Sequence, residues 1–300
     1  MKLGLGTVQF GADYGISNVR GQVAPGEVAE ILQTAAAAGV SVLDTAHAYG
    51  ESESVLGRAL WQGHPFRIVT KTEPLHGSGV GVGELSQVRE TFLRSLERLG
   101  LRRVDALMLH HASELLRPGG EALAQLCMKL KSEGLASKVG FSCYTPSELD
   151  AASAVLAPDI VQLPCNLLDR RFLENGRCAA LKARGVEIHA RSIFLQGLLL
   201  MPADSVPAQF HSHKDVFERI ERCAQANGVT RLELALGFAQ SLDAIDVAVV
   251  GVTGALELRQ IVDAFDKMSA RALDYSGFDT AAEDLVNPST WTRPKSVTVQ

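Results

Sequence analysis

Short apolar runs alternate with longer amphipathic stretches along most of the chain. The apolar runs are rich in Val, Ile and Leu. Several of them are continuous rather than alternating, which is typical of strands buried on both faces of a parallel sheet. The pattern predicts strands over residues 2–8, 40–45, 66–72, 104–111, 136–142, 159–164, 186–193 and 245–252.

Between these runs, apolar residues recur at spacings of three or four, the period of a helix that buries one face. Pro25 opens one such stretch and Gly39 closes it, in the positions that these residues favour at helix ends. One apolar face within residues 84–100 comprises Leu85, Val88, Phe92, Leu96 and Leu99. The predicted helices span residues 25–39, 84–100, 120–134, 145–156, 170–185, 215–228 and 254–268.

Eight strands that alternate with helices, without a break in composition, favour one parallel α/β unit. Eight such units in 300 residues fit a single (β/α)8 TIM barrel over residues 1–300, with an irregular C-terminal tail over about 287–300. The alternative is an open doubly wound sheet. That fold needs a glycine-rich turn leading directly into a helix, and no amphipathic helix follows GLGTVQFG at residues 4–11.

The composition narrows the possible partners and the compartment. The net charge of -5 gives no electrostatic footprint for nucleic acid, and no basic run suggests a membrane surface. No signal peptide and no apolar stretch of roughly 20 residues is evident. The five cysteines form no CxxC or zinc-like spacing, which favours free thiols in a reducing cytoplasm and no metal. The sequence leaves the oligomeric state open.

Polar residues stand at the ends of successive predicted strands, where the functional groups of such barrels lie. The stretch LDTAHAYGES places Asp44 and Tyr49 after the second strand. Lys71 lies at the end of the third strand, and His110 and His111 lie at the end of the fourth. These residues are far apart in sequence, yet the barrel would bring them to one mouth.

Together, these four residue types have a chemistry that none has alone. A phenol, with a reference pKa near 10, is a poor acid at neutral pH, and a nearby ammonium lowers that pKa. A carboxylate keeps the ammonium charged and in place, and an imidazole can hold a carbonyl oxygen. The set therefore predicts a proton donor for a developing alkoxide. Taken singly, each residue has a structural role as an alternative: a helix cap, a solvated lysine, a rim aromatic or a near-core histidine.

Residues 3 to 265 resemble the aldo-keto reductase family, segment by segment and in order. The most specific match is GVSVLDTAHAYGESESVLGRAL, which resembles the family signature around its catalytic Asp and Tyr. The other matching segments are LGLGTVQFG, VTKT, VDALMLHHA, GFSCYTPSEL, VQLPCNLLDRR and VVGVTGALELRQI.

The resemblance implies a (β/α)8 barrel that binds a nicotinamide cofactor without a Rossmann domain. It implies an NAD(P)-dependent oxidoreductase that reduces a small aldehyde or ketone by hydride transfer. Tyr49 would be the general acid, Lys71 and Asp44 would tune it, and His110 would orient the carbonyl. The family motif places its histidine at His110, and His111 would face the other way because strand side chains alternate.

The resemblance also implies the cofactor contacts. Ser142 and Gln162 match positions that hold the nicotinamide carboxamide, and residues 191–197 match the loop that touches the ring and pyrophosphate. The complete set of implied cofactor-binding residues is Gly6, Thr7, Asp44, Ser142, Gln162, Arg191, Ser192, Phe194, Leu195, Gly197, Gly251, Val252, Thr253 and Glu257.

Two departures from the family pattern affect the nicotinamide end. Cys143 stands where many members have an asparagine, so one carboxamide contact is lost or passes to the backbone. A reactive thiol at Cys143 is an alternative, but no base accompanies it in the sequence. Arg191 stands where an aromatic residue often stacks on the nicotinamide, and Phe194 is the candidate to cover the ring instead.

A third departure affects the choice between NADPH and NADH. Members that prefer NADPH place a cation near the eighth strand to bind the 2′-phosphate, for which arginine is well suited. Here residues 251–254 carry no charge, Glu257 occupies the expected position, and Arg259 is the only cation nearby in sequence. We therefore expect relaxed specificity or an NADH preference. The alternative is that Arg259 reaches the phosphate.

The substrate is the least determined part, since loops do not reveal their ligand. The long first loop, residues 9–22, resembles that of family members found with sugar-modifying enzymes, which suggests a sugar or sugar-derived carbonyl. Tyr14, Trp61, His76 and residues 201–213 are candidates to line the substrate pocket.

Two other functions remain as alternatives. A non-catalytic nicotinamide-binding or regulatory barrel subunit is disfavoured by the intact set Asp44, Tyr49, Lys71 and His110. A lyase or aldolase that forms a Schiff base on Lys71 would need a lowered lysine pKa, whereas Asp44 is expected to raise it.

Overall fold

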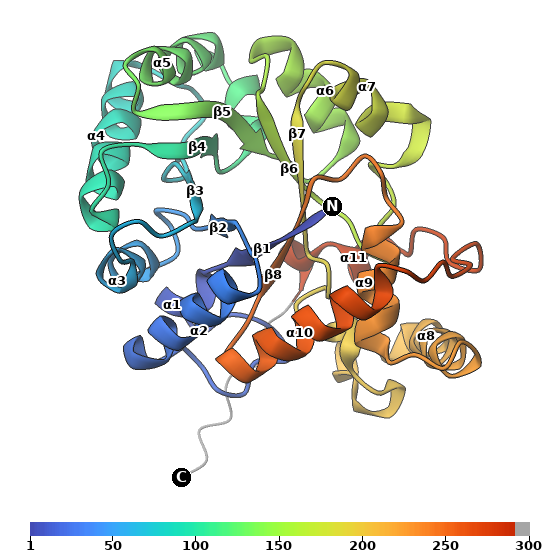
Figure 1. Cartoon of the computed structure of the whole chain (residues 1–300). Coiled ribbons are helices and arrows are strands. Elements are labelled where there is room, and N and C mark those ends of the chain that lie inside the picture. Colours follow the sequence, from blue (N-terminus) through green and yellow to red (C-terminus); the bar gives the residue numbers. More distant parts are fainter. Residues whose placement is uncertain (292–300) are drawn as a thin grey trace.

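The computed structural model describes residues 1–291, in which eight parallel strands form a closed barrel (Figure 1). The strands pair in sequence order, and β1 pairs with β8, with Gly4 opposite Val249. This pairing confirms the predicted (β/α)8 barrel and excludes the open sheet. The strands are β1 Lys2–Gly6, β2 Val42–Asp44, β3 Arg67–Lys71, β4 Val104–Leu109, β5 Ala136–Ser142, β6 Ile160–Pro164, β7 Glu187–Arg191 and β8 Val247–Gly251.

Helices surround the barrel, as Figure 1 shows. The α-helices are α1 Val8–Gly11, α2 Pro25–Ala37, α3 Ser52–Ala59, α4 Val82–Leu99, α5 Gly120–Ser132, α6 Pro146–Val155, α7 Arg177–Ala183, α8 Lys214–Ala226, α9 Arg231–Gln240, α10 Ala255–Met268 and α11 Glu283–Val286. The 3-10 turns are η1 Ala112–Leu116, η2 Glu174–Gly176, η3 Leu198–Leu200, η4 Ala203–Ser205, η5 Ala208–His213 and η6 Pro288–Thr290.

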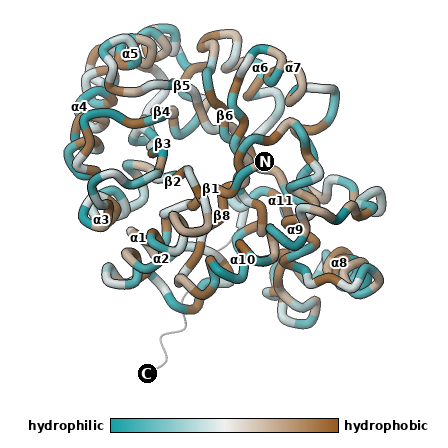
Figure 2. The backbone as a smooth tube through the Cα atoms, in the orientation of Figure 1, coloured by the Kyte–Doolittle hydropathy of each residue, from teal (hydrophilic) through white to brown (hydrophobic). Residues whose placement is uncertain are grey.

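The strands are buried on both faces, which explains their continuous apolar runs. Figure 2 shows β8 coloured as hydrophobic over most of its length. Side chains alternate along each strand between the barrel interior and the helices. Leu43 and Leu107 point outward and pack in the larger core shared with the helices. The barrel interior is filled by Val42, Val69, Ala106, Met108, Ile160, Val247 and Val249.

Several elements differ between the prediction and the structure. The helix expected over 170–185 is helical only in α7, because Asn175 and Gly176 adopt positive φ values of 55° and 68° that break the helix. The predicted fourth strand ends at Leu109 rather than at residue 111. Helix α9 was missing from the prediction, because residues 233–239 are buried almost all round and show no polar face.

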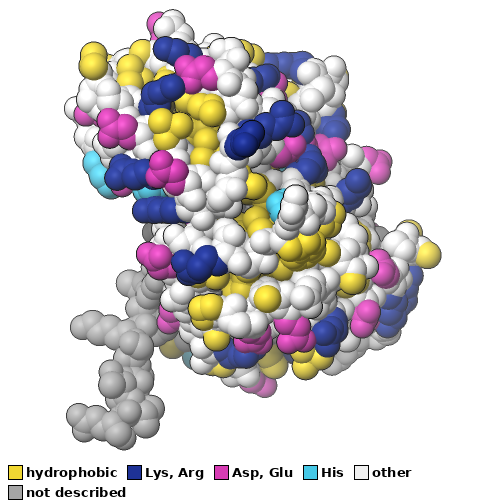
Figure 3. Space-filling view, turned by 60° about the vertical axis from the view of Figure 1, so that its left-hand side comes forward, with side chains coloured by type: hydrophobic (Ala, Val, Ile, Leu, Met, Phe, Trp, Pro, Cys, Tyr) yellow, Lys and Arg dark blue, Asp and Glu magenta, His cyan; other side chains and the backbone are white. Residues whose placement is uncertain are grey.

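The outer surface and the C-terminal segment complete the description. Figure 3 shows Lys and Arg side chains interspersed with Asp and Glu on the face displayed. Within residues 1–291, no helix has both the length and the apolar character that crossing a bilayer requires. In the predicted tail, η6 is ordered and Trp291 packs edge-on against Phe210 at 4.9 Å. The rest of that tail, residues 292–300, lies outside the described residues.

Candidate active site

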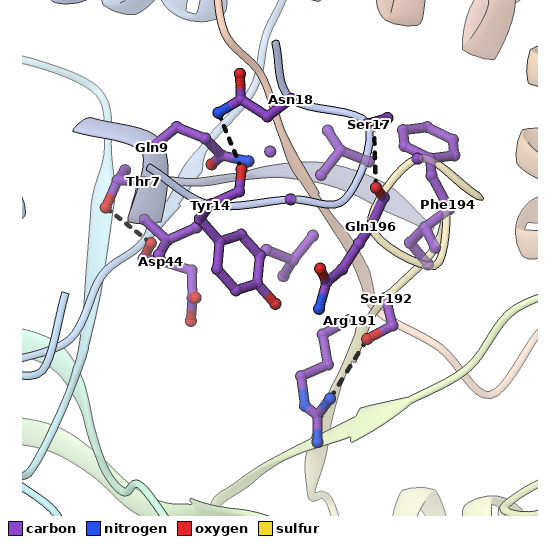
Figure 4. Close-up of a pocket in the computed structure, with 18 of the residues that line it drawn as sticks. Thr7, Gln9, Tyr14, Ser17, Asn18, Asp44, Arg191, Ser192, Phe194 and Gln196 are labelled. Atoms are coloured by element: carbon purple, nitrogen blue, oxygen red, sulfur yellow. Dashed lines mark hydrogen bonds between the residues drawn. The ribbon is translucent and has the colours of Figure 1, made fainter. Parts of the chain in front are cut away.

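A cavity of about 560 Å³ opens at the carboxyl ends of the strands, within the size range of small-molecule sites. Figure 4 shows Asp44 and Thr7 on one side of it, Arg191, Ser192 and Phe194 on the other, and Tyr14 between them. The predicted site residues that line it are Gly6, Thr7, Asp44, Tyr49, Lys71, His110, Ser142, Gln162, Arg191, Ser192, Phe194, Gly197, Gly251, Thr253 and Glu257.

Two predicted cofactor residues, Leu195 and Val252, do not line the cavity. Their side chains are buried in the surrounding core, with exposed fractions of 0% and 1%. Their neighbours in sequence, Phe194 and Gly251, do reach the cavity. Leu195 and Val252 can therefore offer a ligand only their backbone groups.

Lys71 and Asp44 form a buried ion pair at the base of the cavity. Lys71 Nζ donates to both Asp44 carboxylate oxygens at 2.7 Å and to the Thr45 carbonyl oxygen at 3.1 Å. The Tyr49 hydroxyl lies 3.4 Å from the same nitrogen. The pair forms because Asp44 and Lys71 are the last residues of the neighbouring strands β2 and β3.

The expected direction of two pKa shifts is wrong. Burial, reinforced by the Asp44 carboxylate and opposed by Arg191, raises the pKa of Tyr49 rather than lowering it. Burial also lowers the pKa of Lys71, although Asp44 acts in the opposite direction. Desolvation exceeds the pairwise charge effects that the sequence suggested. Tyr49 is consequently a neutral phenol that keeps its proton at ordinary pH.

His110 faces Tyr49 across the cavity, with ring centroids 5.8 Å apart and the rings at 85°. Burial, followed by the positive charge of Lys71, lowers the pKa of His110 to about 3, so the imidazole is neutral. Its Nδ1 is buried and has no hydrogen-bond partner among the described residues. The His111 ring lies 5.0 Å from that of His110, with the two rings tilted by 32°, and does not line the cavity.

Gln162 also holds Asp44, because its Nε2 donates at 2.8 Å to Asp44 Oδ1, an oxygen that accepts from Lys71 as well. Ser142, on the neighbouring β5, also lines the cavity. Next to it, Cys143 is fully buried, and burial raises the pKa of its thiol. A thiol of this kind is protonated and inaccessible, so the structure disfavours the reactive-cysteine alternative.

Residues that the sequence reasoning missed support this cluster from behind. The carboxylate of Glu53, on α3, is completely buried and accepts a hydrogen bond of 2.7 Å from Thr70 Oγ1, beside Lys71. Ser52 Oγ donates to the Thr7 carbonyl oxygen at 2.7 Å, which joins α3 to the end of β1. The sequence could have indicated these two residues, because they closely follow Tyr49 and lie on the buried face of a short helix.

The loop after β7 adopts an unusual backbone. Ser192, Leu195 and Gln196 have φ values of 59°, 49° and 55°, which side-chain-bearing residues seldom adopt. Gly197 has a φ of 88°, and a side chain there would collide with Ser17. Ser17 donates through its hydroxyl and amide groups to the Gln196 carbonyl oxygen at 3.1 and 3.4 Å (Figure 4). The first and seventh loops thereby meet over the cavity.

The start of α10 forms the other end of the cavity. Glu257 accepts hydrogen bonds from the Thr253 amide at 2.7 Å and the Thr253 hydroxyl at 3.0 Å. The carboxylate thus occupies donors of a helix N-terminus that would otherwise attract phosphate.

Two arginines lie near this end of the cavity, whereas the sequence led us to expect only Arg259. Arg259 lies 3.0 Å from Glu30 and is paired with it. Arg20, from the first loop, is closer to the cavity, because its Nη1 donates to the Thr253 carbonyl oxygen at 2.9 Å. Arg20 is itself paired with Glu27 at 3.0 Å. Sequence distance concealed Arg20, and neither arginine is free of a carboxylate partner.

Only some of the residues predicted to line a substrate pocket line the cavity. Tyr14 lines the cavity, and so do Met201 and Pro202 from the predicted loop 201–213. His76 does not line it. The prediction for Trp61 is wrong, because its ring packs on Phe66 at 5.8 Å, just before the amino end of β3. That position is at the opposite end of the barrel.

Similarity to known proteins agrees with this geometry. Residues 2–280 match the Aldo/keto reductase family. A curated relative, the NADH-specific methylglyoxal reductase of Escherichia coli (strain K12), is 29% identical over 201 residues. The match covers 60% of this chain and 61% of that relative, so the chain aligns with less than two thirds of its length.

Solved structures share the fold at lower identity. An aldo-keto reductase from Bacillus halodurans superposes with a TM-score of 0.69 at 20% identity, over 91% of this chain and 88% of that one. A glycerol dehydrogenase from Gluconobacter oxydans gives a TM-score of 0.63 at 18% identity, over 91% and 93%. Because the family match extends over nearly the whole chain, the protein belongs to the aldo/keto reductase family.

Proposed function

We propose that this protein is an NAD(P)-dependent oxidoreductase that reduces a small aldehyde or ketone, with Tyr49 as general acid. The observation that carries the proposal is the arrangement at the cavity base: a neutral phenol lies 3.4 Å from a lysine that a carboxylate holds in place. Family membership and the named activity of the Escherichia coli relative support it.

The described residues fit a nicotinamide dinucleotide. One cavity extends from the reactive cluster at Tyr49 to the helix start at Thr253. Ser142 and Gln162 would hold the carboxamide, the loop 191–197 would contact the nicotinamide ring and the pyrophosphate, and residues 251–257 would hold the adenosine. When bound, the reduced nicotinamide supplies a hydride to the carbonyl carbon.

The side chains of this chain supply the remaining chemistry. The neutral imidazole of His110 carries one N–H that can donate to the carbonyl oxygen and fix its position. Tyr49 transfers its phenolic proton to the alkoxide oxygen, so that hydride and proton together convert the carbonyl to an alcohol. Lys71 stabilises the resulting phenolate, and Asp44 keeps Lys71 charged and in place. The phenol recovers its proton from solvent.

The same ion pair disfavours a Schiff-base mechanism. Lys71 Nζ is surrounded by four acceptor oxygens: Asp44 Oδ1, Asp44 Oδ2, the Thr45 carbonyl oxygen and the Tyr49 hydroxyl. A nucleophilic amine needs a free lone pair. The Asp44 carboxylate favours the ammonium form, which has none, although burial lowers the pKa of Lys71.

We further propose that NADH is preferred over NADPH. At the start of α10 the charges of Arg20 and Glu27 cancel, which leaves the Glu257 carboxylate to repel a 2′-phosphate. The same carboxylate can accept a hydrogen bond from a ribose hydroxyl. The substrate proposed from the first loop, a sugar-derived carbonyl, fits a cavity lined by polar groups of Tyr14, Ser17 and Asn18.

A titration of the purified protein with NADH and NADPH, followed by calorimetry, tests cofactor use before any substrate is known. We expect binding of NADH below the millimolar range, and weaker binding of NADPH. Oxidation of bound NADH by methylglyoxal or glyceraldehyde then tests catalysis. If neither dinucleotide binds below the millimolar range, the oxidoreductase proposal is wrong.

A further inference from the structure

Arg191, at the end of β7, is a charged residue of the cavity that the proposed proton transfer does not use. Its Nη2 donates to the Cys143 carbonyl oxygen at 3.2 Å, and its Nη1 lies 3.4 Å from Ser192 Oγ. A guanidinium has five N–H donors, so three are left without an acceptor among the described residues. These donors are available to a ligand.

The guanidinium is held in place rather than free to turn toward solvent. Its central carbon lies 4.2 Å from the ring centroid of Tyr144, as in a cation–π contact. Ser192, which follows it directly, has the positive φ already described. Figure 4 shows the side chain on the cavity wall below Gln196, with Ser192 beside it. A fixed fork of donors is the geometry that recognises a planar or tetrahedral anion.

No carboxylate neutralises this charge in the described part of the chain. Asp44 is committed to Lys71, and Glu257 binds Thr253 at the far end of the cavity. Glu148, on α6, accepts from the backbone amides of Tyr144 and Ser113 and forms no ion pair with Arg191. At the reacting end Asp44 is paired with Lys71 and His110 is neutral, so among the described residues Arg191 is the cation there without a carboxylate partner.

An uncompensated guanidinium in a half-buried cavity is costly unless a ligand supplies the opposite charge. Its field also reaches the reacting groups, since the Arg191 charge acts on Tyr49, Lys71 and His110. The anion must therefore sit close to the carbonyl that these groups would hold.

We infer that Arg191 selects the substrate: the reducible carbonyl compound carries a carboxylate or phosphate near its carbonyl group, and the guanidinium binds that anion. This inference rests on the proposed function and names the substrate class of the same site. Arg191 thereby differs from a neutral aromatic residue at this position, which would stack on a ring and confer no charge selectivity.

Paired substrates that differ only in the anion test the inference. Succinic semialdehyde is compared with its methyl ester, and glycolaldehyde phosphate with glycolaldehyde. We expect kcat/KM to favour the anion of at least one pair by about tenfold or more, and Arg191→Gln to remove most of that ratio. Preference within the first pair identifies a carboxylate substrate, and preference within the second a phosphate. Arg191→Lys should retain part of the ratio, because it keeps the charge but not the fork.

Arg20→Gln is the matched control, since it removes one positive charge at the other end of the cavity and should leave both ratios unchanged. Calorimetric titration of wild type and Arg191→Gln with succinate and with inorganic phosphate gives a readout that needs no turnover. Equal ratios in wild type and Arg191→Gln, or anion binding that does not depend on Arg191, would overturn the inference. Failure of NADH binding with retained, Arg191-dependent succinate binding would instead count against the proposed function alone.

Discussion

Lys71 Nζ lies at the same distance, 2.7 Å, from both carboxylate oxygens of Asp44, and the two side chains are 1% and 5% exposed. Each strand contributes its last residue to this contact, so the pair is fixed by barrel register rather than by a mobile loop. A buried pair of this kind adds little net stability, but removal of either partner leaves an uncompensated buried charge.

Lys71→Met is therefore expected to lower the free energy of unfolding by about 3–5 kcal/mol, measured by urea denaturation. The double variant Asp44→Asn with Lys71→Met should be less destabilised than Lys71→Met alone, because no charge is stranded. Lys131→Met is the control: its ion pair with Asp159 is about one third exposed and should contribute less than about 1 kcal/mol. Additive effects at positions 44 and 71 would contradict this account.

Tyr49→Phe removes the proposed proton donor and leaves the ring in place. We expect kcat to fall by about 10²–10⁴ with a carbonyl substrate, while the Kd for NADH changes little. Tyr275→Phe is the control, because it deletes a phenol hydroxyl that is buried outside the cavity. Undiminished turnover by Tyr49→Phe would rule out the assigned general acid.

Glu257→Arg replaces the carboxylate at the start of α10 with a cation, and should shift the Kd ratio toward NADPH by about tenfold or more. Glu30→Gln tests the alternative, because it releases Arg259 from its ion pair. A gain of NADPH affinity in Glu30→Gln, with none in Glu257→Arg, would assign the phosphate contact to Arg259. Calorimetry with both dinucleotides measures the change.

Glu114, in the turn after β4, gives a prediction for pH. Its Oε1 accepts from the Leu75 amide at 2.8 Å, and burial raises the pKa of the carboxyl to about 7 from its ordinary 4.5. The folded protein thus binds this proton more tightly than the unfolded chain, so the contribution to stability is complete below pH 4.5 and is lost as pH rises to 7.

Glu114→Gln should abolish that loss. The free energy of unfolding of Glu114→Gln, relative to that of wild type, is expected to rise between pH 4.5 and 7 by an amount on the order of 2–3 kcal/mol. Above pH 7 the difference should level off. Urea denaturation across this pH range measures the difference, with Glu121→Gln on the exposed side of α5 as control. A difference between Glu114→Gln and wild type that does not vary with pH would show that Glu114 keeps its ordinary pKa when folded.

The elements that sequence predicted well are those whose pattern is local. Strand β8 is a plain run of apolar residues, and α4 repeats them every three or four positions, so both were found. Helix α9 was not, because burial on all sides removes the polar face that marks a helix. Likewise, the apolar pattern around Asn175 does not indicate that its positive φ interrupts the predicted helix.

In the candidate site, too, the features with a local sequence pattern were predicted and those that depend on distant contacts were not. Asp44, Tyr49, Lys71 and His110 were identified because each lies at or just past the end of a recognisable strand, and the structure brings them to one cavity. The direction of the pKa shift at Tyr49 was not predicted correctly, because it depends on how many atoms exclude water from the phenol. The partners of Arg20 and Arg191 depend on contacts between distant segments, which a linear pattern does not encode.

The contact between Ser17 and Gln196 has a kinetic consequence. Two exposed hydrogen bonds converge on one carbonyl oxygen, and each contributes only about 0.5–1.5 kcal/mol. If they alone held the two loops together, with roughly 1–3 kcal/mol in total, the parted state would make up roughly 1–15% of the molecules at equilibrium. A long molecule could then settle into the cavity sideways when the loops separate, instead of threading end-first, and its departure rate would depend on how often this pair of bonds breaks.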